Sequence, residues 1–434
     1  GSDELRFASS TAAQTLTVFA ADTGLEKVTI GTGTAAAPDT TASTALNINA
    51  AAAPNGLAIS GNAGTNNLTG TAFADILTGA AGTDSMDGGQ SSDLYLIANS
   101  SDHAAAEIKD SGTTGVDELR FASSTAAQTL TVFAADTGLE KVTIGTGSAA
   151  APVSTATTAL NINAAAAPNA LVITGNAGTN AITGTAFTDT LDGGYGADIY
   201  LVTTATQHTA AEIKDSGTTG SDELRFASST AAQTLTVFAA DTGLETVTIG
   251  TGTAAAPVST ATTALNINAA AAPNALAITG NAGTNSLTGT AFADILTGAA
   301  GTDTMDGGQS SDLYLIASST DHAAAEISDT GTTGSDELRF SSITAGQTLT
   351  VFAADTGLET VTIGTGTAAA PVSTATTALN INAAAAPNGL TISGNAGANN
   401  LTGTAFADIL TGAAGTDTMD GGQSSDLYLI ASST

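Results

Sequence analysis

Cysteine and tryptophan are absent from this chain, and basic residues are scarce. Its 434 residues include 8 Lys and Arg against 40 Asp and Glu, a formal net charge of −32. Without cysteine there are no disulfides and no thiolate metal sites. The shortage of Lys and Arg argues against nucleic acid as a partner, because phosphate binding requires positive charge. A charge of this size also repels itself in a compact state unless cations lie among the carboxylates.

Aromatic residues and long apolar runs are also scarce. No run reaches the roughly 18 apolar residues of a transmembrane helix, and the first residues show no charged-then-apolar signal segment. Aromatics make up 4% of the chain, and much of its 42% hydrophobic content is Ala, which predicts a thin core of Leu, Ile and Val. Residues 1–5 recur unchanged at 220–224, so we expect the chain to begin and end inside a longer protein.

What is present is a tandem repeat of four near-identical copies. The predicted domains are residues 1–114, 115–219, 220–333 and 334–434. The second copy is shorter than the first by nine residues, and the fourth is incomplete. Such arrays stack in one dimension, so that each coil contacts only its neighbours. The pattern therefore predicts an all-β fold, a right-handed parallel β-roll or β-helix solenoid.

Alternating apolar and polar residues predict several strands in each copy. In the first copy they lie at residues 5–7, 16–18, 28–30 and 46–49. The rest of the Ala- and Thr-rich zone from 34 to 55 is expected to be loop. Its Ala50–Ala53 run is limited to about one turn by Pro54.

Glycine and an oxygen-bearing residue recur every nine residues within each copy. In the first copy, glycines at 61, 70, 79 and 88 precede Asn66, Asp75, Asp84 and Asp93 by five positions, and an apolar residue follows two positions later. Glycine permits the tight turn, the side-chain oxygen is a calcium ligand, and the apolar residue faces the interior of a short strand. Because the second copy has lost one such step, nine residues form a structural unit.

One more nonapeptide lies at the joint between copies. Gly112, Gly115, Asp117 and Leu119 keep the spacing of the ladder, and Asp222 and Asp336 are the equivalents of Asp117. The joint is therefore predicted to be another coil, which makes the four copies one continuous rod. Asp110 with Asp117 is either a further calcium site or part of an ordinary turn.

If two nonapeptides close one coil, residues eighteen apart stack on one another. Asn66 then lies on Asp84, and Asp75 on Asp93. Since Ca²⁺ takes six to eight oxygen ligands, we predict about two ladder ions per full copy and fewer in the second copy. The predicted ligands are Asn66, Asp75, Asp84, Asp93, Asp117, Asn180, Asp189, Asp198, Asp222, Asn285, Asp294, Asp303, Asp312, Asp336, Asn399, Asp408, Asp417 and Asp426. The alternative is a metal-free solenoid whose aspartates only cap turns.

These segments resemble the repeats-in-toxin, or haemolysin-type, calcium-binding family, whose nonapeptide reads Gly-Gly-x-Gly-x-Asp-x-apolar-x. Residues 193–200 match best, whereas Ser91 and Phe73 stand where the pattern has its third glycine. The resemblance implies a parallel β-roll that is unfolded at low calcium and folds after export by type I secretion. Metal binding then supplies folding free energy.

Other recurring residues carry weaker signals. We expect His103, His208 and His322 to be solvated loop residues, because no set of partners at zinc-ligand spacing accompanies them. The arginines that follow each Asp-Glu-Leu are expected to pair with neighbouring carboxylates. Outward strand positions account for the Thr-x-Thr runs better than an ice-binding face does.

The sequence favours a structural role over catalysis. No His-Glu-x-x-His or Gly-x-Ser-x-Gly motif is present, so we predict that this chain is not an enzyme. The first hypothesis is a calcium-stiffened bacterial extracellular rod that self-associates into a filament, sheath, surface layer or biofilm matrix. The alternatives are the stalk of a giant adhesin that contacts a cell surface or polysaccharide, and the calcium-binding and secretion module of an exported enzyme or toxin.

Overall fold

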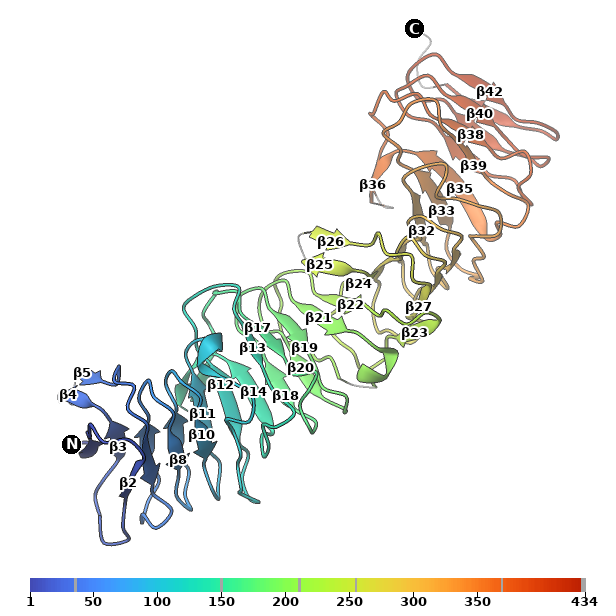
Figure 1. Cartoon of the computed structure of the whole chain (residues 1–434). Coiled ribbons are helices and arrows are strands. Elements are labelled where there is room, and N and C mark those ends of the chain that lie inside the picture. Colours follow the sequence, from blue (N-terminus) through green and yellow to red (C-terminus); the bar gives the residue numbers. More distant parts are fainter. Residues whose placement is uncertain (35–36, 149–150, 210–211, 254–255, 368–369, 431–434) are drawn as a thin grey trace. The chain divides into compact units, whose positions relative to one another are not determined.

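Nearly all regular structure in this protein is short parallel β-strands (Figure 1). The computed structural model describes residues 1–34, 37–148, 151–209, 212–253, 256–367 and 370–430. Within these residues the only helices are two 3₁₀ turns, and no helix has the length and apolar character that crossing a bilayer requires. The predicted all-β parallel solenoid is therefore confirmed.

The strands recur in the same order in each copy. The first copy contains β1 Glu4–Phe7, β2 Gln14–Thr17, β3 Lys27–Ile30, β4 Thr32–Thr34, β5 Ala37–Asp39, β6 Leu46–Asn49, β7 Ala58–Ser60, β8 Asn67–Thr69, β9 Ile76–Thr78, β10 Ser85–Asp87, β11 Leu94–Ile97 and the 3₁₀ turn η1 Ser100–Asp102. The second contains β12 Glu118–Phe121, β13 Thr129–Thr131, β14 Lys141–Ile144, β15 Thr146–Ser148, β16 Ala151–Val153, β17 Asn161–Asn163, β18 Val172–Thr174, β19 Ala181–Thr183, β20 Thr190–Asp192, β21 Ile199–Val202 and η2 Ala205–Gln207.

The last two copies repeat this order without a described 3₁₀ turn. The third contains β22 Glu223–Phe226, β23 Gln233–Thr236, β24 Thr246–Ile249, β25 Thr251–Thr253, β26 Ala256–Val258, β27 Leu265–Asn268, β28 Ala277–Thr279, β29 Ser286–Thr288, β30 Ile295–Thr297, β31 Thr304–Asp306 and β32 Leu313–Ile316. The fourth contains β33 Asp336–Phe340, β34 Thr348–Thr350, β35 Leu358–Ile363, β36 Thr365–Thr367, β37 Ala370–Val372, β38 Asn380–Asn382, β39 Thr391–Ser393, β40 Asn400–Thr402, β41 Ile409–Thr411, β42 Thr418–Asp420 and β43 Leu427–Leu429.

The chain divides into two compact units. The first comprises Gly1–Leu201 with Glu212–Asp222, and the second Val202–Ala211 with Glu223–Thr434. One sheet of the first unit has the order β1-β3-β7-β9-β11-β12-β14-β18-β20, and β2-β6-β8-β10 and β13-β17-β19-β21 form its other face. In the second unit, β22-β24-β28-β30-β32-β33-β35-β39-β41-β43 is accompanied by β23-β27-β29-β31 and β34-β38-β40-β42.

The missing nonapeptide of the second copy moves a strand from one sheet to the other. In the first copy, β11 pairs with β9 in the sheet that contains β1. In the second copy the equivalent strand β21 pairs with β19, in the sheet that contains β13. Two nonapeptides close one coil, so losing one is losing half a coil.

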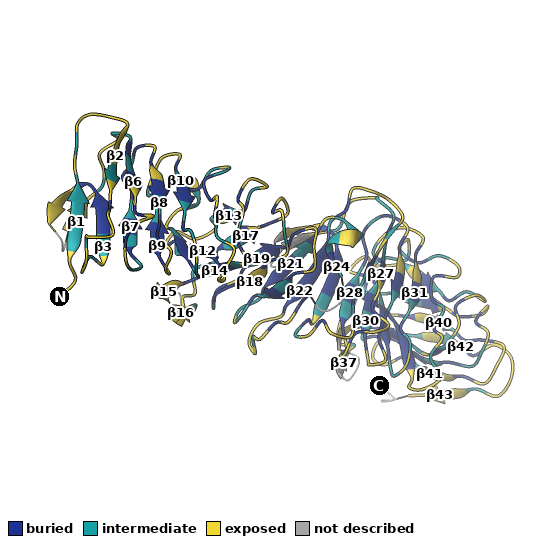
Figure 2. Ribbon diagram, turned by 90° about the horizontal axis from the view of Figure 1, so that it is seen from below, coloured by how far each residue is buried: buried dark blue, intermediate teal, exposed yellow. Residues whose placement is uncertain are grey.

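The core contains a column of apolar side chains that successive strands of the sheet contribute. In the first unit Val28 pairs with Ile59, which lies against Leu77, and Leu77 lies against Tyr95. These side chains have no solvent exposure, whereas the exposed residues lie mostly in the connecting turns and loops, some of whose residues are themselves buried (Figure 2). Because alternate strand residues point to opposite faces, this column fixes the register of every coil.

A hairpin arm interrupts the coil once in each copy, in the zone where we expected a loop. The four arms are the antiparallel pairs β4–β5, β15–β16, β25–β26 and β36–β37. An arginine contacts each arm, and it is buried in the last three copies and half-buried in the first. Arg120 donates to the carbonyl of Gly147 and to Glu118 at 2.7 Å. The predicted pairing of this arginine with a carboxylate is thus confirmed.

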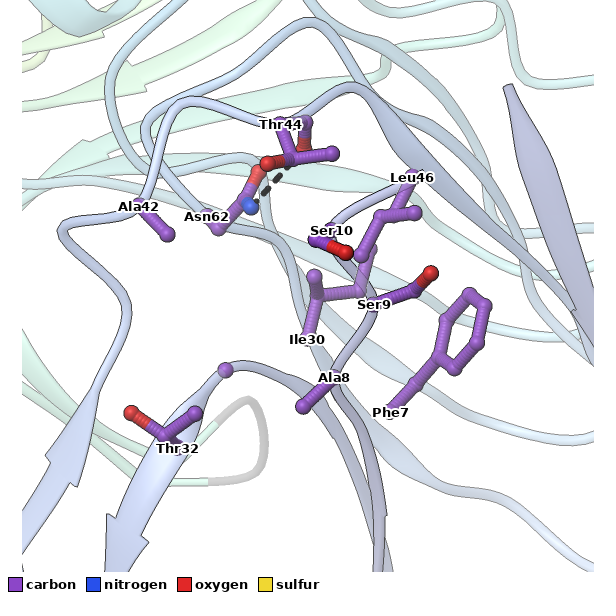
Figure 3. A pocket seen from close by; sticks show the side chains of 11 residues that line it. Phe7, Ala8, Ser9, Ser10, Ile30, Thr32, Ala42, Thr44, Leu46 and Asn62 are labelled. Carbon is purple, nitrogen blue, oxygen red and sulfur yellow. Dashed lines mark hydrogen bonds between the residues drawn. The ribbon is translucent and has the colours of Figure 1, made fainter. Parts of the chain in front are cut away.

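A cavity of about 360 Å³ lies beside the first hairpin arm (Figure 3). Phe7, Ile30 and Leu46 form its apolar side, and Asn62 donates to the Thr44 carbonyl at 3.0 Å on its edge. The third copy has an equivalent cavity of about 230 Å³. Among the described residues that line the two cavities, none has a titratable side chain.

Candidate metal centre

The aspartates of the nonapeptides form axial columns that tie each coil to the one before it. The N–H of Asn66 donates to Asp84 Oδ1 at 2.8 Å, and the N–H of Asp75 donates to Asp93 Oδ1 at 2.7 Å. Both bonds join residues eighteen apart, so the predicted stacking is found. The same bonds recur in the other copies.

The columns also continue through the joint. The N–H of Asp93 donates to Asp117 Oδ1 at 2.8 Å, and that of Asp117 donates to Glu140 Oε2 at 2.8 Å. In the other column the N–H of Asp84 donates to Glu107 Oε1 at 3.0 Å. In the joint coil, as in the ladder, a carboxylate accepts a hydrogen bond from a backbone N–H of the preceding coil.

Two kinds of turn present these side chains, and backbone conformation separates them. We call the first kind αL turns, because residues at their second and fourth positions have positive φ. They begin at Gly79, Gly88, Gly193, Gly298, Gly307, Gly412 and Gly421. In the turn from Gly88, Gly89 has φ 98° and Ser91 has φ 88°. Ser91 therefore occupies the left-handed conformation of the family's third glycine, at some conformational cost.

The second kind are capped turns, in which the side chain closes its own turn. They begin at Gly61, Gly70, Gly175, Gly184, Gly280, Gly289, Gly394 and Gly403, and none of their second or fourth residues has positive φ. Asp75 Oδ2 accepts the N–H of Thr71 at 2.5 Å, and Asp75 Oδ1 accepts that of Leu57 at 2.6 Å. Both carboxylate oxygens of a capped turn are thus engaged with backbone.

Five of the seven αL turns leave one carboxylate oxygen buried without a hydrogen-bond partner. Among the described residues these atoms are Oδ2 of Asp84, Asp93, Asp198, Asp303 and Asp312. A buried anionic oxygen without a donor is costly unless a cation or a proton lies beside it. The five atoms divide as two, one and two among the first three copies. The second copy, which has lost one nonapeptide, thus has one such oxygen fewer, and the number of ladder ions remains a prediction.

Burial strongly perturbs the ionisation of these groups. It raises the pKa of Asp84 to about 7, and the nearby charges of Glu107 and Asp102 add to the rise against the hydrogen bond from Asn66. Burial raises the pKa of Asp93 to about 8, with Asp75 among the charges that contribute. The metal-free fold therefore favours protons on these carboxyl groups near neutral pH, in the positions that a metal ion would occupy.

The predicted asparagine ligands are placed as turn caps. Asn66 Oδ1 accepts the N–H of Asn62 at 2.8 Å, and its Nδ2 donates to the Leu46 carbonyl at 2.7 Å and to Asn62 Oδ1. The same arrangement holds the equivalents Asn180, Asn285 and Asn399. Asp189, Asp294 and Asp408 share the capped geometry of Asp75. The geometry therefore favours αL-turn aspartates over capped-turn residues as metal ligands.

The remaining predicted ligands lie in the fourth copy and at the joints. Asp417 and Asp426 follow αL turns, accept the N–H groups of Asn399 and Asp408 at 3.0 Å, and are half-buried. Asp117, Asp222 and Asp336 are buried, and each lies close to the last ladder aspartate of the preceding copy.

The histidines are not solvated loop residues, so that prediction is wrong. The His103 side chain is buried between Glu107, 3.3 Å from its Nδ1, and Asp136, 3.0 Å from its Nε2, and its ring is tilted by 50° against that of Phe133. His322 has equivalent partners, and His208 lies 2.9 Å from Asp241. Burial alone would lower the pKa of His103, but the hydrogen bonds and charges of Asp136 and Glu107 outweigh it and raise the pKa to about 9.

Position along the chain explains why this cluster was missed. Glu107 follows His103 by four residues, but Asp136 lies 33 residues away in the next coil. The sequence does contain one indication of this cluster. One histidine and one aspartate reappear at the same place in successive copies. The His103 imidazolium offsets the negative charge of Glu107. Glu107 is the member of the column whose Oε1 accepts the N–H of Asp84.

Comparison with protein families matches residues 60–95, 174–201, 279–314 and 393–428 to the RTX calcium-binding nonapeptide repeat. The chain carries four copies of this repeat. The RTX segments contain the αL turns and capped turns described above, and RTX repeats are typical of secreted bacterial proteins. Comparison with curated proteins and with solved structures found no match.

The two kinds of turn predict different effects for the same substitution. Asp84→Asn should remove one bound calcium ion, because it replaces the unpartnered oxygen with an amide group. Asp75→Asn should leave the ion count unchanged and lower the melting temperature, because it weakens a backbone cap. Equilibrium dialysis with calcium analysis of both folded variants is the measurement. Equal ion loss in the two variants would contradict the division of the RTX turns.

The metal-free protein should lose stability as pH rises. The pKa values of Asp84 and Asp93 are about 7 and about 8 when folded, against 3.8 for an ordinary aspartate. Between about pH 4 and pH 8 the unfolded chain has therefore released protons that the folded chain retains, so the free energy of unfolding falls. Thermal unfolding by circular dichroism in calcium-depleted buffer should show a lower melting temperature at pH 8 than at pH 5. Calcium should reverse this trend, and a calcium-free melting temperature that rises with pH would contradict it.

His103 should stabilise the fold only while it is protonated. Its folded pKa is about 9 against 6.5, so its contribution is complete below pH 6.5 and is lost as pH rises through 9. His103→Gln should destabilise the protein by about 3–5 kcal/mol at pH 6, the usual cost of leaving a buried charge unpaired. Adding Asp136→Asn should recover part of this loss. Denaturant unfolding at pH 6 and pH 9 tests it, and a loss of equal size at both values would show that packing alone is involved.

Proposed function

We propose that this chain is a calcium-dependent structural repeat protein, located outside a bacterial cell, whose copies form a stiff rod. The observation that carries the proposal is the column of carboxylates. Within a copy, the N–H of Asp75 donates to the Asp93 carboxylate. Across the joint, the N–H of Asp93 donates to the Asp117 carboxylate in the same way. The joint from Asp312 to Asp336 has the same bond at 2.8 Å. Joints built like coils favour length and stiffness over independent domains.

The charge of the chain supports a role for calcium in stiffening. A net charge of −32 opposes a compact state, and the columns bring carboxylates close together in a buried position. Divalent cations that bind only the folded chain stabilise it by mass action. Folding would thus wait for the millimolar calcium of an extracellular medium, which fits the occurrence of RTX repeats in secreted proteins.

We further propose that the rods self-associate into a filament, sheath, surface layer or biofilm matrix, and that the chain has no catalytic role. Near-identical copies extend length without adding new chemistry. Their aspartates are engaged in column bonds, turn caps and prospective metal sites. The stalk of a giant adhesin that contacts a cell surface or polysaccharide is the second candidate, and the same continuous joints favour it.

Imaging under two calcium conditions separates these functions. Negative-stain microscopy at millimolar calcium should show regular lateral or end-to-end assemblies of the intact chain. Removal of calcium should disperse them, weaken the β-sheet circular dichroism and lower the melting temperature. Isolated extended monomers at millimolar calcium would favour the adhesin stalk. A circular dichroism signal and melting temperature that do not respond to chelation would contradict calcium-dependent folding itself.

A further inference from the structure

Three aspartates meet at the first joint, and one of them lies outside the RTX repeat. Asp93, Asp110 and Asp117 are buried and place one carboxylate oxygen each within 4.8 Å of the others. Asp93 belongs to the last αL turn of the first copy, whereas Asp110 and Asp117 follow residue 95, where the RTX match ends. Asp110 is held by Tyr95, whose hydroxyl donates to Asp110 Oδ2 at 2.5 Å.

The unpartnered oxygen of Asp93 is a separate indication that this cluster binds a ligand. Asp93 is 1% exposed, and its Oδ1 accepts the N–H of Asp75. Its Oδ2 has no hydrogen-bond partner. Both oxygens of the preceding column member, Asp75, accept backbone N–H groups. Asp110 accepts the N–H of Gly112 and the Tyr95 hydroxyl, and Asp117 Oδ1 accepts the N–H of Asp93. These bonds hold Asp110 and Asp117 with one oxygen each within 4.8 Å of an Asp93 oxygen, so they are the carboxylates placed to share a ligand with Asp93.

We propose that each joint binds one calcium ion between three carboxylates, Asp93, Asp110 and Asp117 at the first joint. The cluster contains only oxygen donors, which suits a hard divalent cation and does not favour zinc or copper. Three carboxylates brought together in a buried site repel one another, and a divalent ion offsets most of that charge. The joint site is thus a metal site that the RTX repeat alone does not supply.

Glycine at the joint allows two turns to approach closely enough to share an ion. A Cβ on Gly112 would collide with the carbonyl oxygen of Gly89, and one on Gly115 would collide with that of Ser91. Both carbonyls belong to the αL turn that presents Asp93. Because Ca²⁺ takes six to eight oxygen ligands, carbonyls of this turn and water would complete the coordination shell.

The cluster recurs at the other two joints, although the second copy has lost half a coil. Asp198, Asp215 and Asp222 form one such cluster, and Asp312, Asp329 and Asp336 the other. Oδ2 of Asp198 and of Asp312 is again buried without a partner. In the second copy the axial partner before Asp198 is Asn180, where the first copy has Asp75. The cluster therefore forms at every joint, even where its first aspartate belongs to a different column.

Tyrosine-sensitised terbium luminescence provides a direct readout of the joint site. Tb³⁺ replaces Ca²⁺ at oxygen sites and is excited by nearby tyrosine, and the chain has five tyrosines and no tryptophan. Tyr95, Tyr200 and Tyr314 each donate to an aspartate of a joint cluster. In a background with Tyr195→Phe and Tyr428→Phe, only these three tyrosines remain. Folded protein should then show strong sensitised emission that excess calcium displaces.

The deciding comparison is between two charge-matched triple variants in that background. Substituting Asp110, Asp215 and Asp329 with Asn should abolish the emission, remove three calcium ions in equilibrium dialysis and weaken binding at the joints by at least about tenfold. Substituting Asp87, Asp192 and Asp306 with Asn should change neither result, since these residues accept backbone bonds beside the joints but lie outside the clusters. An unchanged ion count in the first variant, or an equal loss in the second, would overturn the proposal.

A single substitution covers the case in which the triple variant does not fold. Asp215→Asn alters one joint and leaves two intact, and it should lose one ion and about a third of the emission. Retention of that ion by the folded single variant would overturn the proposal. These readouts count bound ions, so they remain informative even if the protein forms no rods or filaments.

Discussion

The bond on which this structure depends joins a carboxylate oxygen to a backbone N–H one coil earlier. The bond between the Asp75 N–H and Asp93 Oδ1 serves two purposes at once. It satisfies a backbone donor in a turn, where no strand partner is available, and it fixes the axial position of one coil on the next. Its consequence is a column of buried like charges, which is stable only if cations or protons accompany it.

The backbone of each turn decides whether a carboxylate has an oxygen left for metal. In a capped turn such as that of Asp75, the second residue donates to the side chain and both oxygens are used. Positive φ at the second and fourth positions prevents this closure, and Oδ2 of Asp84 or Asp93 is left buried and unpartnered. Capped turns thus extend the coil with both carboxylate oxygens hydrogen-bonded to backbone, whereas αL turns create sites that need a cation.

Much of this arrangement follows from the sequence, because the nine-residue period determines which residues stack. The spacing predicted the eighteen-residue pairs, the strands around Val28 and Ile48, and the coil-like joint at Asp117. Other features depend on contacts between coils of unequal length. Burial of His103 requires Asp136 from the following coil, and the hairpin arms arise in an Ala- and Thr-rich zone without clear periodicity. The sequence predicts only part of the division into αL turns and capped turns. Ser91, for example, adopts a backbone conformation that is usual for glycine.

The joint coil compensates buried carboxylates in two different ways, and the difference has a physical reason. In one column Glu107 reaches His103, a cation that the chain itself supplies. In the other, Asp93, Asp110 and Asp117 converge without any basic side chain in the cluster. A buried imidazolium needs no ion from solution, so it supports the joint at any calcium concentration below about pH 9. The trio of aspartates lacks such a partner and is most costly when calcium is absent. The joints are therefore where the metal-free chain should be least stable and where calcium should stabilise the fold most.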